Sequence, residues 1–149
     1  MTIGPTDLIL LDTTILVHWL RGDATGERLL RDYELHCRIE RPLLSTTTHG
    51  EILGLARMWS WGEQKLTHLR DLLSELVRVD AGLPEVVDAY ADLYARSQQN
   101  GWGSGENDLW IAASAVACGA VLMTCDTDFV RLQSGGLRVE HIEPEKRGN

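Results

Sequence analysis

Short apolar runs alternate with longer stretches of helical spacing along this chain of 149 residues, and no other feature constrains its fold as strongly. Apolar runs bounded by turn residues are typical of buried strands, whereas apolar residues that recur every third or fourth position are typical of helices. Strands that alternate with helices predict an α/β fold. We therefore expect a three-layer α/β/α sandwich around a mostly parallel sheet of about five strands. The expected strands lie at 7–12, 43–46, 76–80, 121–124 and 137–143.

The segments between these strands have the spacing of amphipathic helices. In the second of them, Leu29, Tyr33 and Cys37 are expected to face the core. In the third, Thr47 or Thr48 is the expected N-cap, the residue whose side chain accepts a hydrogen bond from a free backbone N–H of the first turn. The helical segments are 13–23, 24–40, 47–59, 62–76, 83–99 and 107–120, with a flexible glycine-rich loop expected at 100–107.

The composition is that of an ordinary globular protein, with 44% hydrophobic and 24% charged residues. A chain of this length is expected to form one domain, here at 1–143, followed by a disordered tail at 144–149. The formal net charge of −8 argues against a protein that coats nucleic acid nonspecifically, because such binding depends on Lys and Arg. No apolar run suits a transmembrane helix or a signal peptide. We therefore expect a cytoplasmic protein that does not associate with a membrane. The three cysteines are expected to be reduced thiols.

Carboxylates lie at or just after the ends of the expected strands. The functional groups of parallel α/β sheets gather where strands give way to helices, at the carboxyl edge of the sheet. These acids are therefore expected to converge there, although each one taken alone is also explained as a helix cap or a solvated side chain. The acids in question are Asp12, Glu51, Asp108, Asp126 and Asp128.

Carboxylates that converge in this way need a positive partner. Negative charges a few ångströms apart repel one another and raise one another's pKa values. Mg²⁺ or Mn²⁺ is the natural partner, because hard cations prefer oxygen ligands and keep bound water for catalysis. The sequence therefore predicts a site for Mg²⁺ or Mn²⁺ built by these acids.

Three segments of the chain resemble, in order and spacing, the conserved blocks of PIN-domain ribonucleases. They are LLDTTILVHWLRG at 10–22, STTTHGEILGLARM at 45–58, and NDLWIAASAVACGAVLMTCDTDF at 107–129. The last block is the most specific, because its Asp-x-x-Ile-Ala-Ala and Thr-x-Asp-x-Asp-Phe patterns are hard to meet by chance. The resemblance spans about residues 8–142, and the size of the chain is similar to that of the VapC-type toxins of toxin–antitoxin pairs.

The resemblance implies a metal-dependent endoribonuclease that hydrolyses RNA and leaves a 5′-phosphate and a 3′-hydroxyl. It also implies a homodimer and a cognate antitoxin that lays a segment, often with an arginine, into the acidic groove. The implied catalytic residues are Asp12, Glu51, Asp108 and Asp126, with Asp12, Asp108 and Asp126 as metal ligands and Thr13, Thr124 and Asp128 as supporting residues. The role of Asp128 stays open between ligand, outer acid and helix cap.

The sequence alone leaves two other functions open. Phosphatases of the haloacid-dehalogenase type also begin with an Asp after an apolar strand, but they need a second Asp two positions later, where this chain has Thr14. A PIN-like module that binds without cutting is the second alternative. Trp102 is the best candidate for an aromatic that faces substrate or a partner, whereas Arg21, Arg57 and Arg131 suit either phosphate contacts or surface ion pairs.

Overall fold

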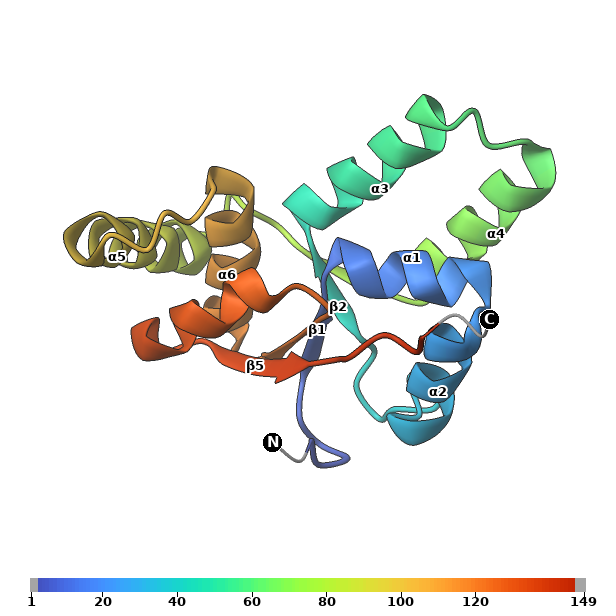
Figure 1. The fold of residues 1–149 in the computed structure, drawn as a ribbon, viewed down its shortest axis with the longest axis horizontal. Coiled ribbons are helices and arrows are strands. Elements are labelled where there is room, and N and C mark those ends of the chain that lie inside the picture. The colour runs from blue at the N-terminus through green and yellow to red at the C-terminus, as the bar shows by residue number, and fades with distance from the viewer. Residues whose placement is uncertain (1–2, 147–149) are drawn as a thin grey trace.

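A computed structural model describes residues 3–146 of the chain. Its centre is a five-stranded sheet in the order β3-β2-β1-β4-β5, and every strand pairs in parallel with its neighbours (Figure 1). The predicted three-layer α/β/α sandwich around a parallel sheet is confirmed. The strands are β1 (Ile9–Leu11), β2 (Leu43–Ser45), β3 (Val77–Val79), β4 (Val121–Thr124) and β5 (Arg138–His141).

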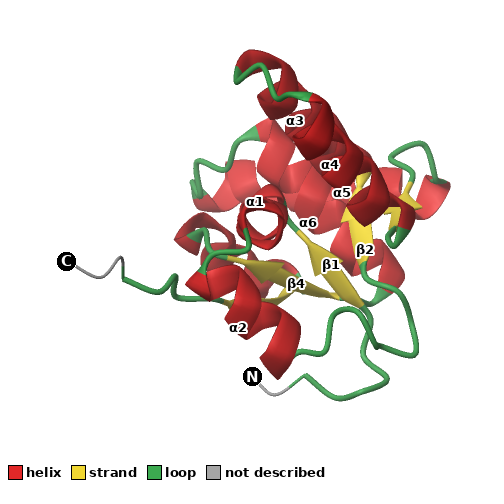
Figure 2. Cartoon of the chain, turned by 90° about the vertical axis from the view of Figure 1, so that its right-hand side faces the viewer, coloured by secondary structure: helices red, strands yellow, loops and turns green. Residues whose placement is uncertain are grey.

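Helices cover both faces of the sheet. Four of them, α1 to α4, lie on the face turned toward the viewer in Figure 2, and α5, α6 and the 3₁₀ helix η1 cover the other face. The helices are α1 (Thr13–Arg21), α2 (Ala24–Asp32), α3 (Thr46–Met58), α4 (Glu63–Ser74), α5 (Pro84–Asn100), α6 (Glu106–Cys118) and η1 (Thr127–Gly135).

The core is divided in two by the sheet, because successive strand residues point to opposite faces. In β1, Ile9 and Leu11 pack among α1 to α4, whereas Leu10 packs among α5, α6 and η1. In β4, Met123 packs among α1 to α4, whereas Leu122 packs among α5, α6 and η1. Burial on both faces explains why these strands read as continuous apolar runs rather than as alternating patterns.

The second helix is shorter than predicted. α2 ends at Asp32, with Tyr33 as its C-cap, and Glu34 has a positive φ of 50°. A right-handed helix cannot continue through that conformation. Cys37 is exposed and does not face the core, whereas Leu35 is buried from within a turn. The helical spacing of apolar residues in the sequence therefore extends beyond the helix itself, which ends at Asp32.

The N-cap of α3 also differs from the prediction. It is Ser45, the last residue of β2, whose Oγ accepts a hydrogen bond from the backbone N–H of Thr48 at 3.0 Å. The strand therefore passes into the helix without a linker. Glu51 lies in the second turn of this helix as a result.

The proposed boundary of the domain and the disordered tail stay predictions. Residues 144–146 have neither helix nor strand, and the backbone N–H of Glu145 donates to Oγ1 of Thr25 at 2.8 Å. The remainder of the expected tail, 147–149, lies outside the described residues. No helix within 3–146 combines the length and the apolar character that a membrane crossing requires.

Gly26 in α2 is expected to tolerate no side chain. A Cβ at this position would lie 2.2 Å from the carbonyl oxygen of His18, a backbone atom of α1 that cannot turn aside. We expect Gly26→Ala to lower the free energy of unfolding by about 1–3 kcal/mol, the usual range for overpacking. Urea unfolding measures this change.

Gly54→Ala is the matched control for that substitution. Gly54 lies in α3, and a Cβ there would meet no atom within 4 Å. Since Ala favours helix over Gly, we expect this variant to be more stable by about 0.5–1 kcal/mol. Equal effects of the two substitutions would contradict the tight packing of α1 against α2.

Candidate metal centre

The candidate site lies where two neighbouring strands send the chain in opposite directions. β1 ends before Asp12 and leads toward β2, whereas β4 ends before Asp126 and leads toward β5. The two strands pair directly, with Leu11 opposite Met123. Parallel α/β sheets bind ligands at such a switch point, outside the carboxyl ends of the strands. The strand order therefore brings Asp12 and Asp126 to the same part of the sheet edge.

Asp12 is almost fully buried and is held by hydroxyl groups. Its side chain is the N-cap of α1, with Oδ1 accepting from the backbone N–H of Ile15 at 3.3 Å and from Oγ1 of Thr14 at 2.6 Å. Oδ2 accepts from Oγ1 of Thr124 at 2.5 Å. Burial raises the pKa of Asp12, although the hydrogen bonds from Thr124 and Thr14 favour its charged form. These contacts fix the carboxylate in one orientation.

Two threonine hydroxyls connect Asp12 with the segment that follows β4. Oγ1 of Thr124 accepts from the backbone N–H of Asp126 at 2.9 Å while donating to Asp12. Oγ1 of Thr14 accepts from the backbone N–H of Cys125 at 3.0 Å while donating to the same carboxylate. Thr14 was missed as a site residue in the sequence. The hydroxyl pair directly after Asp12 was the signal that could have revealed it.

Glu51 is connected to the same region through α1. Its Oε1 accepts from Oγ1 of Thr13 at 3.0 Å, and both side chains are partly buried. Thr13, the first residue of α1, directly follows Asp12. This hydrogen bond therefore places Glu51 from α3 beside the helix start that Asp12 caps.

Three carboxylates lie closest to one another. Asp108 on α6, Asp126 after β4 and Asp128 in η1 each present an oxygen, and these oxygens all lie within 4.8 Å of one another. Asp12 and Glu51 lie outside this tight group. Asp126, and not Asp128, is the N-cap of η1, because Oδ1 of Asp126 accepts from the backbone N–H of Asp128 at 2.8 Å.

The electrostatics of Asp108 show how closely the five acids are grouped. Burial and, after it, the negative charges of Asp126, Asp128, Glu51 and Asp12 together raise the pKa of Asp108 to about 6. Among residues 3–146, Arg131 is the only basic residue that forms an ion pair with one of the five acids. Its Nη2 lies 3.5 Å from Oδ1 of Asp128. The site therefore carries an excess of negative charge.

These features fit a divalent cation. All side chains of the group offer oxygen, the donor that Mg²⁺ and Mn²⁺ prefer. Three carboxylate oxygens are already near enough to share one ion, and their mutual repulsion is the kind that a cation relieves. Asp108, Asp126 and Asp128 form the tightest candidate set, and Asp12 is oriented beside it by Thr124.

Replacing Asp108 with Asn is expected to stabilise the metal-free protein at neutral pH. The folded state raises the pKa of this carboxyl to about 6, whereas an unfolded chain leaves it at about 3.9. The folded state therefore binds the proton more tightly, so stability falls as pH rises between these two values and stays low above them. At pH 7 we expect the variant to be more stable by about 1–2 kcal/mol, a figure reduced because water partly screens this half-buried group.

Urea unfolding in EDTA at low and neutral pH checks this prediction. Below the pKa of the unfolded chain, Asp108 is neutral in both states, so parent and variant are expected to be equally stable there. A difference in stability that is the same at both pH values would contradict the raised pKa.

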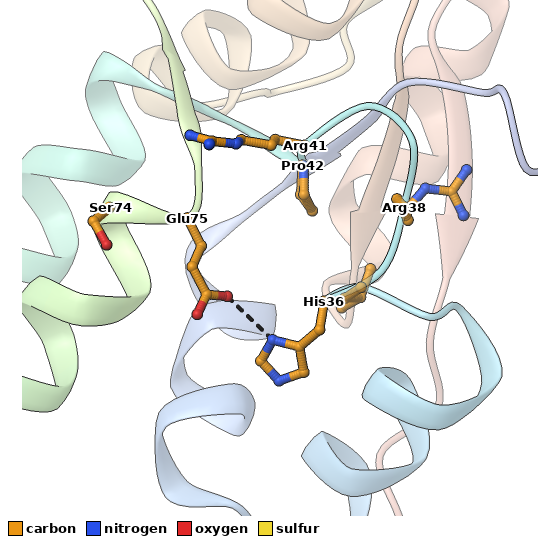
Figure 3. A pocket seen from close by; sticks show the side chains of 7 residues that line it. His36, Arg38, Arg41, Pro42, Ser74 and Glu75 are labelled. Atoms are coloured by element: carbon orange, nitrogen blue, oxygen red, sulfur yellow. Dashed lines mark hydrogen bonds and ion pairs between the residues drawn. The ribbon is translucent and has the colours of Figure 1, made fainter.

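Two sizeable cavities of the described chain include none of the five acids in their linings. One of about 520 Å³ lies before β2 and β3, at the edge of the sheet opposite the acids. Figure 3 shows His36 turned toward Glu75, with Nδ1 and Oε2 3.1 Å apart, and Arg38 pointing away from them. The guanidinium of Arg38 instead binds backbone carbonyls, including that of Gly4 at 2.6 Å. We therefore place the functional site by the chemistry of the acids, not by cavity size.

A family model described as PIN domain matches residues 9–134. The chain belongs to the PIN domain family. The match covers most of the chain and includes all five acids. It agrees with the resemblance that the three sequence blocks carry.

Solved structures place this PIN domain among known folds. It is 25% identical to a chain of VapBC2 from Rickettsia felis, crystallised with a DNA fragment from its promoter, with a TM-score of 0.79 and coverage of 91% of this chain and 99% of that chain. VapBC from Salmonella typhimurium, also bound to DNA, gives 22% identity, a TM-score of 0.74 and coverage of 91% and 98%. VapBC-5 of Mycobacterium tuberculosis gives 24% identity, a TM-score of 0.65 and coverage of 91% and 98%. The last two similarities concern the fold alone.

Among curated protein sequences, none matches this PIN domain significantly. The PIN domain model shows its family, and the similarity to the VapBC2 chain agrees with its fold.

Proposed function

We propose that this protein is a metal-dependent endoribonuclease that hydrolyses phosphodiester bonds in RNA. The observation that carries the proposal is the group of three carboxylates within 4.8 Å, located at the switch point of a PIN domain. A group of carboxylates in this position suits a divalent cation held beside a phosphate.

The side chains of the site divide into ligands and supports. Asp108 and Asp126 would present half-buried carboxylates to the cation, and Asp12, whose Oδ2 accepts one hydrogen bond and keeps a lone pair, completes the proposed ligand set. Thr124 and Thr14 orient Asp12 through their hydroxyls. Asp128 lies near enough to serve as a further ligand, so its role as an outer acid or a ligand is part of this proposal.

Mg²⁺ or Mn²⁺ bound at this site supplies a positive charge for the phosphate and a more acidic water. The residues of this chain fix the geometry in which that chemistry occurs. Glu51, held by Thr13 and partly exposed, is proposed to orient a water through a carboxylate oxygen. Hydrolysis at phosphorus is then expected to leave a 5′-phosphate and a 3′-hydroxyl.

We further propose that the protein is the toxin of a toxin–antitoxin pair. VapBC-5 of Mycobacterium tuberculosis, which it resembles, is a member of the VapBC family of toxin–antitoxin systems, and VapBC2 from Rickettsia felis is a second VapBC structure of similar fold. The excess of carboxylates offers an antitoxin a place to insert an arginine, since a guanidinium binds carboxylates through two parallel hydrogen bonds. A homodimer and cytoplasmic residence belong to the same proposal.

Cleavage of labelled RNA tests the nuclease proposal. Single-stranded and hairpin RNAs are incubated with the parent or with Asp12→Asn, in Mg²⁺, Mn²⁺ or EDTA. We expect cleavage by the parent in either metal, none in EDTA, and very little by the variant. If parent and variant behave alike on all RNAs, the proposal is wrong.

The alternatives have their own signatures in the same experiment. Release of phosphate from small phosphomonoesters, without cleavage of RNA, would favour a phosphatase. RNA that is bound but never cut would favour a non-catalytic module. A phosphatase of this type needs a second acid two positions after Asp12, where this chain has Thr14. The hydroxyl of Thr14 donates to Asp12 and accepts from the backbone N–H of Cys125.

A further inference from the structure

A single arginine connects η1 with the loop that precedes α6. Nε of Arg131 donates to the backbone carbonyl of Asp128 at 3.1 Å, and Nη2 lies 3.5 Å from Oδ1 of the same residue. Nη1 donates to the backbone carbonyl of Trp102, which is 29 positions away in sequence. The guanidinium therefore spans two segments that are separate in the chain.

The indole ring of Trp102 makes a second connection between the same segments. The ring is partly buried against the core formed by α5, α6 and η1. A methyl group built on Gly135, at the end of η1, would lie 3.4 Å from Cη2 of the ring. The loop is thus attached to η1 through its carbonyl near Arg131 and through its ring at Gly135. We refer to Arg131 and Trp102 together as the clasp.

The loop has few other attachments of its own. Gly101 and Gly103 have positive φ values, and the N-cap of α6 is Gly105, which offers no side chain to the first turn. Oγ of Ser104 is buried without a hydrogen-bond partner in the described part of the chain. The N–H groups of Gly101 and Trp102 donate to the backbone carbonyl of Ser97 in α5, and the clasp is what connects the loop to η1.

The two segments joined by the clasp carry the acids of the metal centre. Asp108 lies in the first turn of α6, directly after the loop, and Asp128 lies in the first turn of η1 beside its N-cap Asp126. The distances within this group therefore depend on how the loop and η1 are held together. A metal site needs its ligands held within a fraction of an ångström, which depends on the contacts behind them.

We propose that the clasp fixes the spacing between Asp108 and the Asp126–Asp128 pair, so that Arg131 is a positioning residue for the metal centre. The inference rests on the proposed function, because it assigns Arg131 to that same site. Two N–H groups of the guanidinium donate to the backbone carbonyls of Asp128 and Trp102, and Nη2 forms an ion pair with the carboxylate of Asp128. This arrangement favours positioning over a direct contact with the phosphate of the substrate.

Binding of Mn²⁺ and amide hydrogen exchange test the clasp without relying on activity. We expect Arg131→Ala to raise the Mn²⁺ dissociation constant by about 10-fold or more, as losses behind metal ligands commonly do. Exchange at residues 101–105 is expected to become faster in the same variant. Arg131→Lys keeps the charge but lacks the planar group that reaches several acceptors, so its dissociation constant should lie within about threefold of the alanine variant.

Controls separate a failure of the clasp from a failure of the proposed function. Arg31→Ala removes an exposed arginine that, within residues 3–146, pairs only with its neighbour Asp32, and it should change neither readout. Asp126→Asn should weaken Mn²⁺ binding strongly. If it does not, the proposed metal centre is wrong and the clasp has no role.

Two results would overturn the clasp while leaving the metal centre intact. The first is weaker Mn²⁺ binding in Asp126→Asn together with unchanged binding and unchanged exchange in Arg131→Ala. The second is full recovery of Mn²⁺ binding in Arg131→Lys, which would mean that only the charge matters. If Arg131→Ala does not fold, the lysine variant and the exchange rates of the loop decide between these outcomes.

Discussion

Asp126→Asn is expected to lower kcat/KM for metal-dependent RNA cleavage by at least about 100-fold. The substitution removes one negative charge from the three carboxylates that lie within 4.8 Å, and with it a ligand of the proposed cation. A metal ion stabilises the transition state by several kcal/mol, and each 1.4 kcal/mol that is lost lowers the rate tenfold. The measurement is the initial rate of cleavage of a labelled RNA at saturating Mg²⁺ or Mn²⁺.

The same substitution should leave the fold intact. Asn keeps a side-chain oxygen that can still accept from the backbone N–H of Asp128, so the cap of η1 is preserved. Asp80→Asn is a matched control. Asp80 also follows a parallel strand, and its Oδ1 accepts from the backbone N–H of Gly82 at 3.0 Å, but it is not among the acids that raise the pKa of Asp108. Equal losses of activity in both variants would contradict the special role of Asp126.

Phe129→Ala is expected to cause the largest loss of stability, about 3–5 kcal/mol in the free energy of unfolding. The ring is 1% exposed and packs in the core beneath η1. A 3₁₀ helix has weaker hydrogen-bond geometry than an α-helix, so this element depends on its packing. A loss of this size in a chain of about 150 residues should lower Tm by at least about 6 °C.

Val130→Ala is the control for Phe129. Val130 is the next residue of η1 but is 42% exposed, so we expect its truncation to cost less than about 1 kcal/mol. Urea unfolding of the two variants gives the comparison. A Phe129→Ala protein within 1 kcal/mol of the parent would mean that η1 is held in place by something other than this ring.

Much of the architecture follows from the period of the apolar pattern. The buried strands β1 and β4 stand out because both of their faces are covered, which leaves no polar position between Ile9 and Leu11 or between Val121 and Met123. The parallel topology then explains why Asp12 and Asp126 lie at the same edge of the sheet, connected through the hydroxyl of Thr124. Those predictions needed only the rule that parallel strands present their carboxyl ends at one edge.

Other features depend on contacts that no local pattern encodes. α2 ends at Asp32 because Glu34 takes a positive φ, and no glycine or proline marks that point in the sequence. The bridge from Asp12 through Thr14 to Cys125 exists because β1 and β4 are neighbours, which the order of strands along the chain does not reveal.

Asp128 illustrates the same limit within the site. A cap, a ligand and an outer acid all fit the sequence at this position, but Asp126 takes the cap and Arg131 pairs with the carboxylate of Asp128. The interaction with Arg131 spans three residues, yet its consequence depends on Trp102 in a distant loop. Side chains whose role is set by a tertiary partner could not be assigned from the sequence alone.

The rate of RNA cleavage as a function of Mn²⁺ concentration tests most directly whether the acids of this site hold a catalytic cation. We expect the parent to show a saturable rise from no cleavage in EDTA, and Asp108→Asn to need at least about tenfold more Mn²⁺ or to fail to saturate, because a ligand and its charge are lost. Cleavage that persists in EDTA, or identical Mn²⁺ curves for the two proteins, would contradict the account.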